Sequence, residues 1–250
     1  GSADWREKSF GTEKIEEELL KMFPQARIAR MDVDAVRGKH AHDELIRLFE
    51  QQRIDILAGT QMVVKGLDFE NVMLIGILDA DALLNFADFR VHERAFQLME
   101  QVSGRAGRKE GLGRVLIQAT KTDSPVLEWV RDHSYEKFYE NEIAVREQFY
   151  YPPFSRLIKI VLKHKKKDVV TAAAFELAAV MEKSFKNISG PAEPVIGRVR
   201  NQYLMNILIK LAADRKKLEN QKDVLKNLIM LLRAKKEFRN VIVVPDVDPY

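Results

Sequence analysis

The sequence contains no cysteine among its 250 residues. Without thiols the chain can form neither a disulfide nor a thiolate metal site, which favours a reducing, cytoplasmic setting. Histidine is scarce as well. The closest of the five are His40 and His42, and no carboxylate or third histidine joins them at ligand spacing. We therefore predict no metal site in this chain.

Long apolar runs are also missing. No stretch is long enough to span a bilayer, and the N-terminus shows no secretory signal. We therefore expect no membrane partner. The opening Gly1-Ser2 is typical of the scar left by tag cleavage, which indicates an excised fragment.

Neither sign of charge dominates, because 41 Lys and Arg residues stand against 37 Asp and Glu residues, a formal net charge of +4. This mildly basic balance is compatible with nucleic acid, but it is weak evidence by itself. The apolar fraction of 46% is enough for a sizeable core in one large domain or two ordinary ones.

Helical and strand patterns alternate over the first 120 residues. Helices are predicted at 12–23, 42–52 and 89–103, and strands at 26–34, 54–60, 71–83 and 113–120. This alternation predicts an α/β fold with a parallel sheet and right-handed crossovers. Thr12 is the predicted N-cap of the first helix. The near-continuous apolar run at 71–83 predicts a strand that is covered on both faces.

A different pattern begins near residue 150, after one more helix predicted at 123–147. The two prolines in Tyr151 to Phe154 predict a stiff corner, so we place the domains at 1–149 and 150–250. The second domain has the predicted order β-α-β-β-α-β, a small α+β unit with helices on one face. Its elements are predicted at 157–163, 168–186, 194–199, 203–211, 214–235 and 241–244.

One short motif, QVSGRAGR, spans Gln101 to Arg108. On a helical turn Arg105 and Arg108 would project from one face. Arginine carries a permanent, bidentate charge that suits a triphosphate. The residues alone leave two other possibilities open, a solvated basic patch and a salt bridge within the domain.

A second motif, GTQMVVKGLDF, spans Gly59 to Phe69 and follows a predicted strand. Gly59 and Gly66 permit close backbone approach. Asp68 could accept a hydrogen bond from a ribose hydroxyl or cap a helix. Three further side chains offer donors that suit a sugar-phosphate backbone without base reading: Thr60, Gln61 and Lys65.

Together these two motifs resemble motifs V and VI in the second RecA-like lobe of superfamily 2 helicases. The resemblance is closest to the primosomal replication-restart helicases, and it covers nearly the whole chain. It rests on an ordered set of further motifs: GTEKIEEEL at 11–19, LDAD at 78–81, DFR with ER at 88–94, YPPF at 151–154 and DVDP at 246–249.

The resemblance implies an ATP-dependent 3′-to-5′ DNA helicase for replication restart and primosome assembly. ATP and Mg would be shared with a first lobe. Arg105 and Arg108 would contact the nucleotide phosphates, with Arg108 as the arginine finger, and Gln101 would couple the nucleotide state to lobe closure. Other roles implied by the resemblance are bordering the nucleotide, for Gly66 and Asp68, and facing the DNA, for Thr60, Gln61 and Lys65.

For the second domain the resemblance implies binding of branched or single-stranded DNA, of single-strand-binding protein and of other primosome proteins. Arg198 and Arg200 beside Tyr203 lie at a predicted hairpin tip, a combination that suits contact with single strands. The basic run from Lys163 to Lys167 is either a phosphate contact or a solvated turn.

The sequence departs from the family pattern in ways that limit its chemistry. It has no G-x-x-x-x-G-K-[ST] phosphate loop and no Walker B aspartate in its usual context. The family's cysteine-rich zinc insertion is missing, so zinc is expected in the full-length protein but not here, and the lobe is expected to lack its first strand.

ATP hydrolysis needs a phosphate cradle, a metal-holding acid and an arginine finger together. We therefore expect this chain alone to be inactive. The alternative is a non-catalytic module for nucleic-acid binding or primosome assembly, built on a helicase scaffold.

Overall fold

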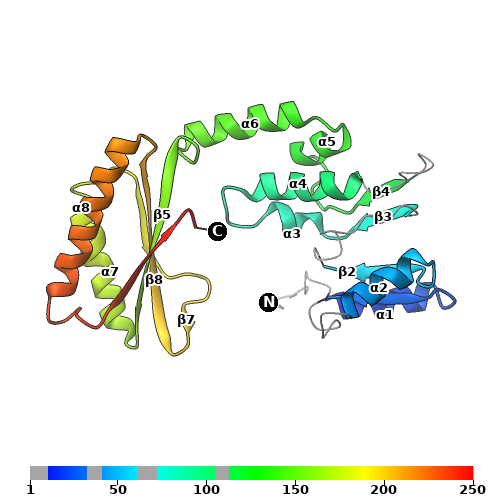
Figure 1. The fold of residues 1–250 in the computed structure, drawn as a ribbon, viewed down its shortest axis with the longest axis horizontal. Helices are drawn as coiled ribbons and strands as arrows, with labels where there is room; N and C mark the ends of the chain where they lie inside the picture. Colours follow the sequence, from blue (N-terminus) through cyan, green and yellow to red (C-terminus); the bar gives the residue numbers. More distant parts are fainter. Residues whose placement is uncertain (1–10, 33–40, 61–71, 105–112, 250) are drawn as a thin grey trace, which may run out of the picture. The chain divides into compact units, whose positions relative to one another are not determined.

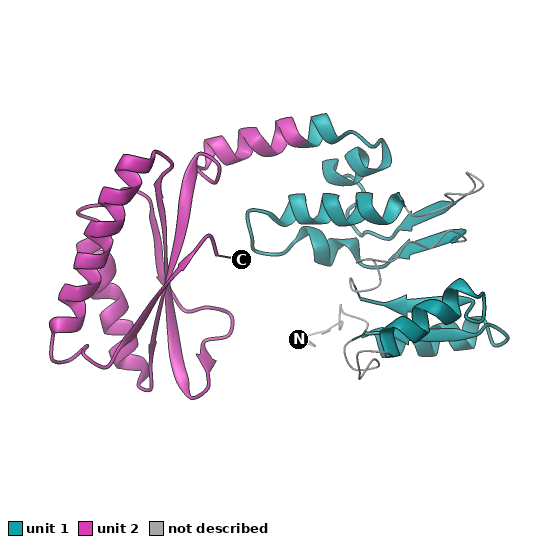
Figure 2. Cartoon of the chain, viewed as in Figure 1, with its two compact units in different colours: residues 1–138 teal, residues 139–250 magenta. Residues whose placement is uncertain are grey.

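The computed structural model describes residues 11–32, 41–60, 72–104 and 113–249. The chain forms two compact units, residues 1–138 and residues 139–250 (Figure 2). Helix α6 (Tyr135–Gln148) contains the boundary between them. Each unit has its own buried apolar side chains.

The first unit begins with a parallel strand pair and two helices: α1 (Thr12–Met22), β1 (Ile28–Met31), α2 (Ala41–Glu50) and β2 (Ile56–Gly59). β1 and β2 pair from Ile28 opposite Ile56 to Met31 opposite Gly59. Met31 is buried and packs against Leu57 and against three apolar side chains of α2: Leu45, Ile46 and Phe49.

The same unit continues with a second parallel pair and four helices: β3 (Leu74–Ile77), α3 (Ala80–Leu84), α4 (Val91–Ser103), β4 (Arg114–Ile117), α5 (Pro125–Arg131) and α6. Phe96 of α4 stacks on Phe138 of α6 at 4.2 Å between ring centroids. Met99 of α4 and Val130 of α5 are buried in the same cluster. The parallel α/β class predicted from the sequence is confirmed, although the described strands form two separate pairs.

Three local predictions in this unit are wrong. Only Leu74–Ile77 of the run at 71–83 is a strand. Its two faces differ: Ile77 packs against the buried cluster, whereas Leu74 projects from the opposite face and is 57% exposed. The strand ends at Ile77, and Asp79, with a positive φ of 52°, then leads the chain into α3. Thr12 does not cap α1, because its hydroxyl donates to the carboxylate of Asp32. The helix predicted at 123–147 is interrupted at His133, whose φ is 49°.

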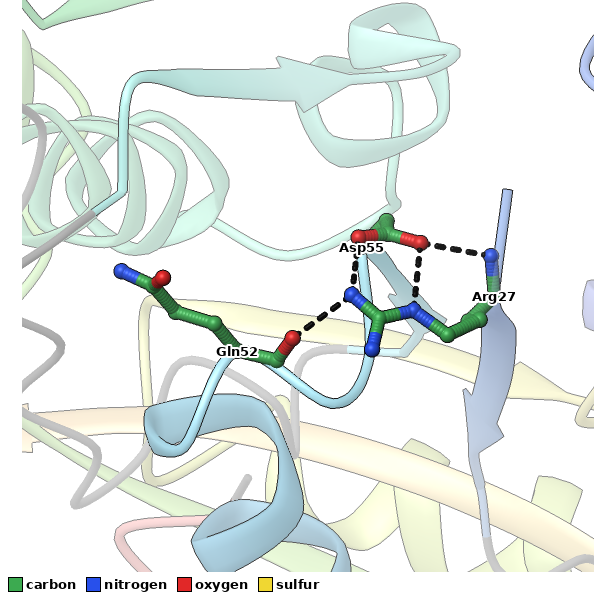
Figure 3. A network of polar contacts seen from close by, with 3 residues as sticks. All are labelled: Arg27, Gln52 and Asp55. Atoms are coloured by element: carbon green, nitrogen blue, oxygen red, sulfur yellow. Dashed lines mark hydrogen bonds and ion pairs between the residues drawn. The ribbon is translucent and has the colours of Figure 1, made fainter. Parts of the chain in front are cut away.

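Arg27 and Asp55 join the starts of β1 and β2 (Figure 3). The Arg27 guanidinium donates to both oxygens of Asp55, at 2.9 Å and 2.6 Å, and to the carbonyl oxygen of Gln52 at 2.6 Å. The backbone N–H of Arg27 donates to Asp55 as well, at 2.7 Å. These hydrogen bonds hold the pKa of Asp55 well below its usual range, with the guanidinium as the largest cause.

We expect Asp55→Asn to reduce the acid sensitivity of the first unit. Since the folded pKa lies below the unfolded value of about 3.9, the ionised carboxylate stabilises the fold above that pH and loses this contribution as the pH falls. Both partners are exposed, so the effect is small. The check is the hydrogen exchange of β1 and β2 amides near about pH 3 and about pH 7. Equal acid sensitivity in both proteins would contradict the prediction.

The second unit is an antiparallel sheet with two helices: β5 (Ser155–His164), α7 (Lys167–Met181), β6 (Ile188–Ala192), β7 (Arg198–Val199), β8 (Gln202–Ala212), α8 (Arg215–Ala234) and β9 (Ile242–Val247). The strand order is β6-β8-β5-β9, with β7 beside β8. Both helices lie on one side of the sheet (Figure 1). Asp214 caps α8, accepting from the N–H of Lys217 at 3.0 Å.

The core of the second unit lies between the sheet and its helices. On β8 the residues that alternate toward the helices are buried, among them Ile207 and Ile209. Their partners on β5, Ile160 and Ile158, are buried too. The prediction of a small α+β unit with both helices on one face is confirmed, but the observed order is β-α-β-β-β-α-β, one strand more than predicted. The strand predicted at 194–199 is wrong, because β6 ends at Ala192 and β7 holds only two residues.

The corner near residue 151 is held by packing. The ammonium of Lys210 lies 3.4 Å from the centroid of the Tyr151 ring and donates to the carbonyl oxygen of Phe149 at 2.7 Å. Burial lowers the pKa of Lys210. The hydroxyl of Ser155 donates to the carbonyl oxygen of Tyr150 at 2.8 Å. One face of the Tyr151 ring is therefore used within the unit.

Candidate nucleic-acid interface

The carboxyl ends of β1 and β2 meet at one edge, because the strands are parallel. Thr60 follows β2 at this edge and is exposed. Asp32 follows β1 and is buried, with the Arg30 guanidinium 3.1 Å from its carboxylate. Since Asp32 also accepts from Thr12, it serves the packing of α1. The edge therefore presents Thr60, the first of the predicted DNA-facing residues.

Most of the predicted motif residues lie outside the described residues. Those predicted from the loop after β2 are Gln61, Lys65, Gly66 and Asp68, and those predicted after α4 are Arg105 and Arg108. Gln101 is described and is exposed in the last turn of α4, which ends at Ser103. The predicted nucleotide roles of these residues remain predictions.

Asp81, at the start of α3, joins the ends of β3 and β4. Its carboxylate accepts the backbone N–H of Thr120 at 2.5 Å and that of Lys121 at 3.3 Å. These bonds, the one from Thr120 above all, lower the pKa of Asp81. The carboxylate thus keeps two loops together at the carboxyl edge of the strands.

In the second unit the strand register gathers residues from three strands in one row. His164 of β5 lies opposite Tyr203 of β8, and Tyr203 lies opposite Arg198 of β7. Directly opposed residues project from the same face of a sheet. The hairpin turns through Arg200 and Asn201, whose φ values of 46° and 66° are typical of a two-residue type I′ turn. The predicted hairpin tip is confirmed, with its turn at Arg200 and Asn201.

Arg198 is held in position by two neighbours. Its guanidinium lies 5.0 Å over the centroid of the Tyr203 ring, and it donates to the side-chain oxygen of Asn201. A stacked guanidinium keeps donors for an anion while losing little side-chain freedom. Arg200 is exposed at the tip of the same hairpin. The two arginines therefore present cationic groups at one end of the sheet.

The basic run after β5 reaches the same end. Lys167 begins α7 and pairs with Glu193 at 2.7 Å, and this contact raises its pKa. Glu193 precedes β7, so the ion pair joins the basic run to the chain that leads into the hairpin. The N-terminus of α7 adds the positive end of a helix dipole. The backbone N–H of Lys166 donates to Nδ1 of His164 at 3.1 Å.

We name this region the basic end. Its cations and acids are Lys163, Lys165, Lys166, Lys167, Arg198, Arg200, Asp168 and Glu193. In the sequence the lysine run and the hairpin are two separate features. Only the pairing of β5 with β8 and of β8 with β7 brings them together. Such an excess of positive charge favours phosphate ligands.

The described parts of the chain contain neither a metal-binding cluster nor a membrane-spanning helix. No cluster of three or more His, Cys, Asp or Glu side chains there could hold a metal ion. No helix there is both long and apolar enough to cross a membrane.

The comparison with family models first defines the class of protein. Residues 8–110 match the helicase conserved C-terminal domain, in agreement with the two motifs and the parallel strands. Residues 147–250 match the primosomal protein N C-terminal domain. The first unit is therefore a helicase C-terminal domain, and the second has the fold of a primosomal protein domain.

Curated relatives then identify the family. The replication restart protein PriA of Bacillus subtilis is 38% identical over 96% of this chain and 30% of its own length. The PriA proteins of Synechocystis and Treponema pallidum are 41% and 40% identical, over 80% and 84% of the chain. The chain belongs to the PriA family. It spans 24–32% of the length of these three relatives.

Proposed function

We propose that this chain works as part of an ATP-dependent 3′-to-5′ DNA helicase for replication restart and primosome assembly. The family models and the relatives' name support a helicase role in replication restart. The observation that carries the DNA contact is the basic end, where two basic segments distant in the sequence meet beside a stacked arginine. Its charge suits a phosphate backbone.

The nucleotide role belongs to the first unit. Arg108 is the proposed arginine finger, Arg105 a second phosphate contact and Gln101 the coupling residue, while Gly66 and Asp68 border the nucleotide. The exposed position of Gln101 in the last turn of α4 supports this proposal. ATP and Mg would be shared with a lobe that carries the phosphate cradle. Because no cradle motif occurs in this sequence, the chain alone should not hydrolyse ATP.

The DNA role is divided between the units. Thr60, Gln61 and Lys65 are proposed to contact the sugar-phosphate backbone after β2. In the second unit Arg198 and Arg200 are proposed to contact phosphates, with Tyr203 orienting Arg198 from below its guanidinium plane. The proposed partners are branched or single-stranded DNA, single-strand-binding protein and other primosome proteins.

Removing the two hairpin arginines should weaken DNA binding and its dependence on salt. Each phosphate contact contributes about 0.7–0.9 to the slope of log K against log salt concentration. Arg198→Ala with Arg200→Ala should therefore lower that slope by about 1.4–1.8. The measurement is fluorescence anisotropy of a labelled DNA fork over a salt series. The matched control is Lys216→Ala with Lys217→Ala, two exposed charges at the start of α8.

An equal loss of slope in both double variants would show that only net charge matters, and would remove the basic end as the binding site. Lys65→Ala tests the first unit separately in the same titration. Absence of binding by the unaltered chain at low salt would contradict the proposed DNA role of both units.

A further inference from the structure

The loop between β6 and β7 exposes two large aliphatic side chains at the basic end. Val195 is 106% exposed and Ile196 is 69% exposed. Val199, in the hairpin that follows, is 47% exposed. Single exposed apolar residues are common on protein surfaces. Here three exposed aliphatic residues lie within five consecutive positions, beside a cluster of cations. This grouping indicates a surface for a ligand.

The loop is anchored on both sides of these residues. Before them, the carboxylate of Glu193 pairs with Lys167 at 2.7 Å. After them, the carbonyl oxygen of Gly197 accepts the backbone N–H of Leu204 at 2.9 Å. A chain of three residues between two anchors extends about 10 Å at most. Val195 and Ile196 are therefore kept close to Arg198, Arg200 and the N-terminus of α7.

A ligand for this surface must offer negative charge and an apolar face together. A continuous DNA duplex offers phosphates, but its base faces are stacked inside. A duplex that ends or opens into single strands exposes the face of the last base pair. Aliphatic side chains of DNA-binding proteins are known to insert between base steps and to contact the base faces there, beside basic residues.

We propose that Val195 and Ile196 pack against the base face exposed where duplex DNA meets single-stranded DNA, while the basic end holds the adjoining phosphates. The loop then determines a preference for junctions over continuous duplex. This inference rests on the proposed function of the basic end. An acidic protein segment would also match the charge, but the stacked arginine and the N-terminus of α7 suit phosphates better.

The test compares two DNAs with the complete chain. A labelled fork is the probe, and a relaxed, covalently closed circular duplex, which has no ends, is the competitor. Val195→Ser with Ile196→Ser should weaken fork binding about tenfold, as expected for the loss of apolar contact, and leave the affinity for the circle unchanged. The matched control is Met230→Ser with Leu231→Ser, an adjacent pair on α8 that is 64% and 66% exposed. It should leave both affinities unchanged.

The possible outcomes separate this inference from the proposed function. Arg198→Ala with Arg200→Ala should weaken binding to both DNAs, whatever the loop does. If the double serine variant binds both DNAs more weakly by the same factor, or binds both as before, the inference is wrong while the DNA role stands. If the unaltered chain binds neither DNA, the inference and the proposed DNA role are both wrong. If poly-glutamate binds the chain and needs Val195 and Ile196 while DNA does not, the loop takes an acidic protein and the inference is overturned.

Discussion

Arg108→Ala should lower the kcat of ATP hydrolysis by about 10³-fold when this chain is joined to a lobe that carries a phosphate cradle. An arginine finger stabilises charge that develops on the transferring phosphoryl group. Its loss therefore raises the free energy of the transition state more than that of the bound substrate. The KM for ATP should therefore change much less than kcat. The measurement is steady-state ATP hydrolysis in the presence of single-stranded DNA.

Arg105→Ala is the matched control, because this residue has the same chemistry three positions earlier in the motif. It should raise the KM for ATP and lower kcat less than Arg108→Ala does. The reverse pattern would make Arg105 the finger. If neither variant changes the rate of ATP hydrolysis, the motif is a solvated basic patch. That result would support the hypothesis that the chain is a non-catalytic module.

The second unit could be predicted well because its local signals agree with its tertiary packing. Alternating apolar residues on β8 correctly indicate the face that packs on α7 and α8. Asp214 precedes a long amphipathic run and caps α8. β6 was not predicted, because its sequence, ISGPA, contains glycine and proline, which are poor strand residues. They are tolerated here because β6 is an edge strand.

The first unit was predicted less well where tertiary contacts decide the local structure. Thr12 has the chemistry of an N-cap, yet it bonds to Asp32, twenty residues away. The apolar run at 71–83 has no internal sign that it becomes helix α3 after Asp79. Nor does the sequence show that His133 interrupts the helical pattern, where its ring nitrogen lies 3.1 Å from both carboxylate oxygens of Glu100.

The candidate site shows the same division. The motif residues could be named from the sequence because they are contiguous and the resemblance assigns their roles. The basic end could not be named as one surface, because Lys167 and Arg198 are 31 residues apart. Their proximity depends on the register of β5, β8 and β7 and on the ion pair to Glu193. Register depends on pairing between strands distant in the sequence, so a search for motifs does not detect it.

Ile207→Ala should destabilise the second unit by about 2–5 kcal/mol. Ile207 is fully buried in β8, lies opposite Ile160 of β5, and belongs to the cluster between the sheet and its helices. Truncating it leaves a cavity that the close-packed core can fill only in part. Because the chain has two compact units, a single unfolding midpoint would be ambiguous. Hydrogen exchange resolved by segment measures each unit separately.

The loss of protection should be confined to residues 139–250, while the amides of β1 and β2 exchange as before. Leu231→Ala, at a site that is 66% exposed, should change stability by less than about 0.5 kcal/mol. The same strand that buries Ile207 begins at the hairpin that carries Arg198. The affinity for forked DNA should therefore fall with the folded fraction of the second unit. Unchanged DNA binding by a variant whose second unit is largely unfolded would show that the basic end does not depend on this sheet.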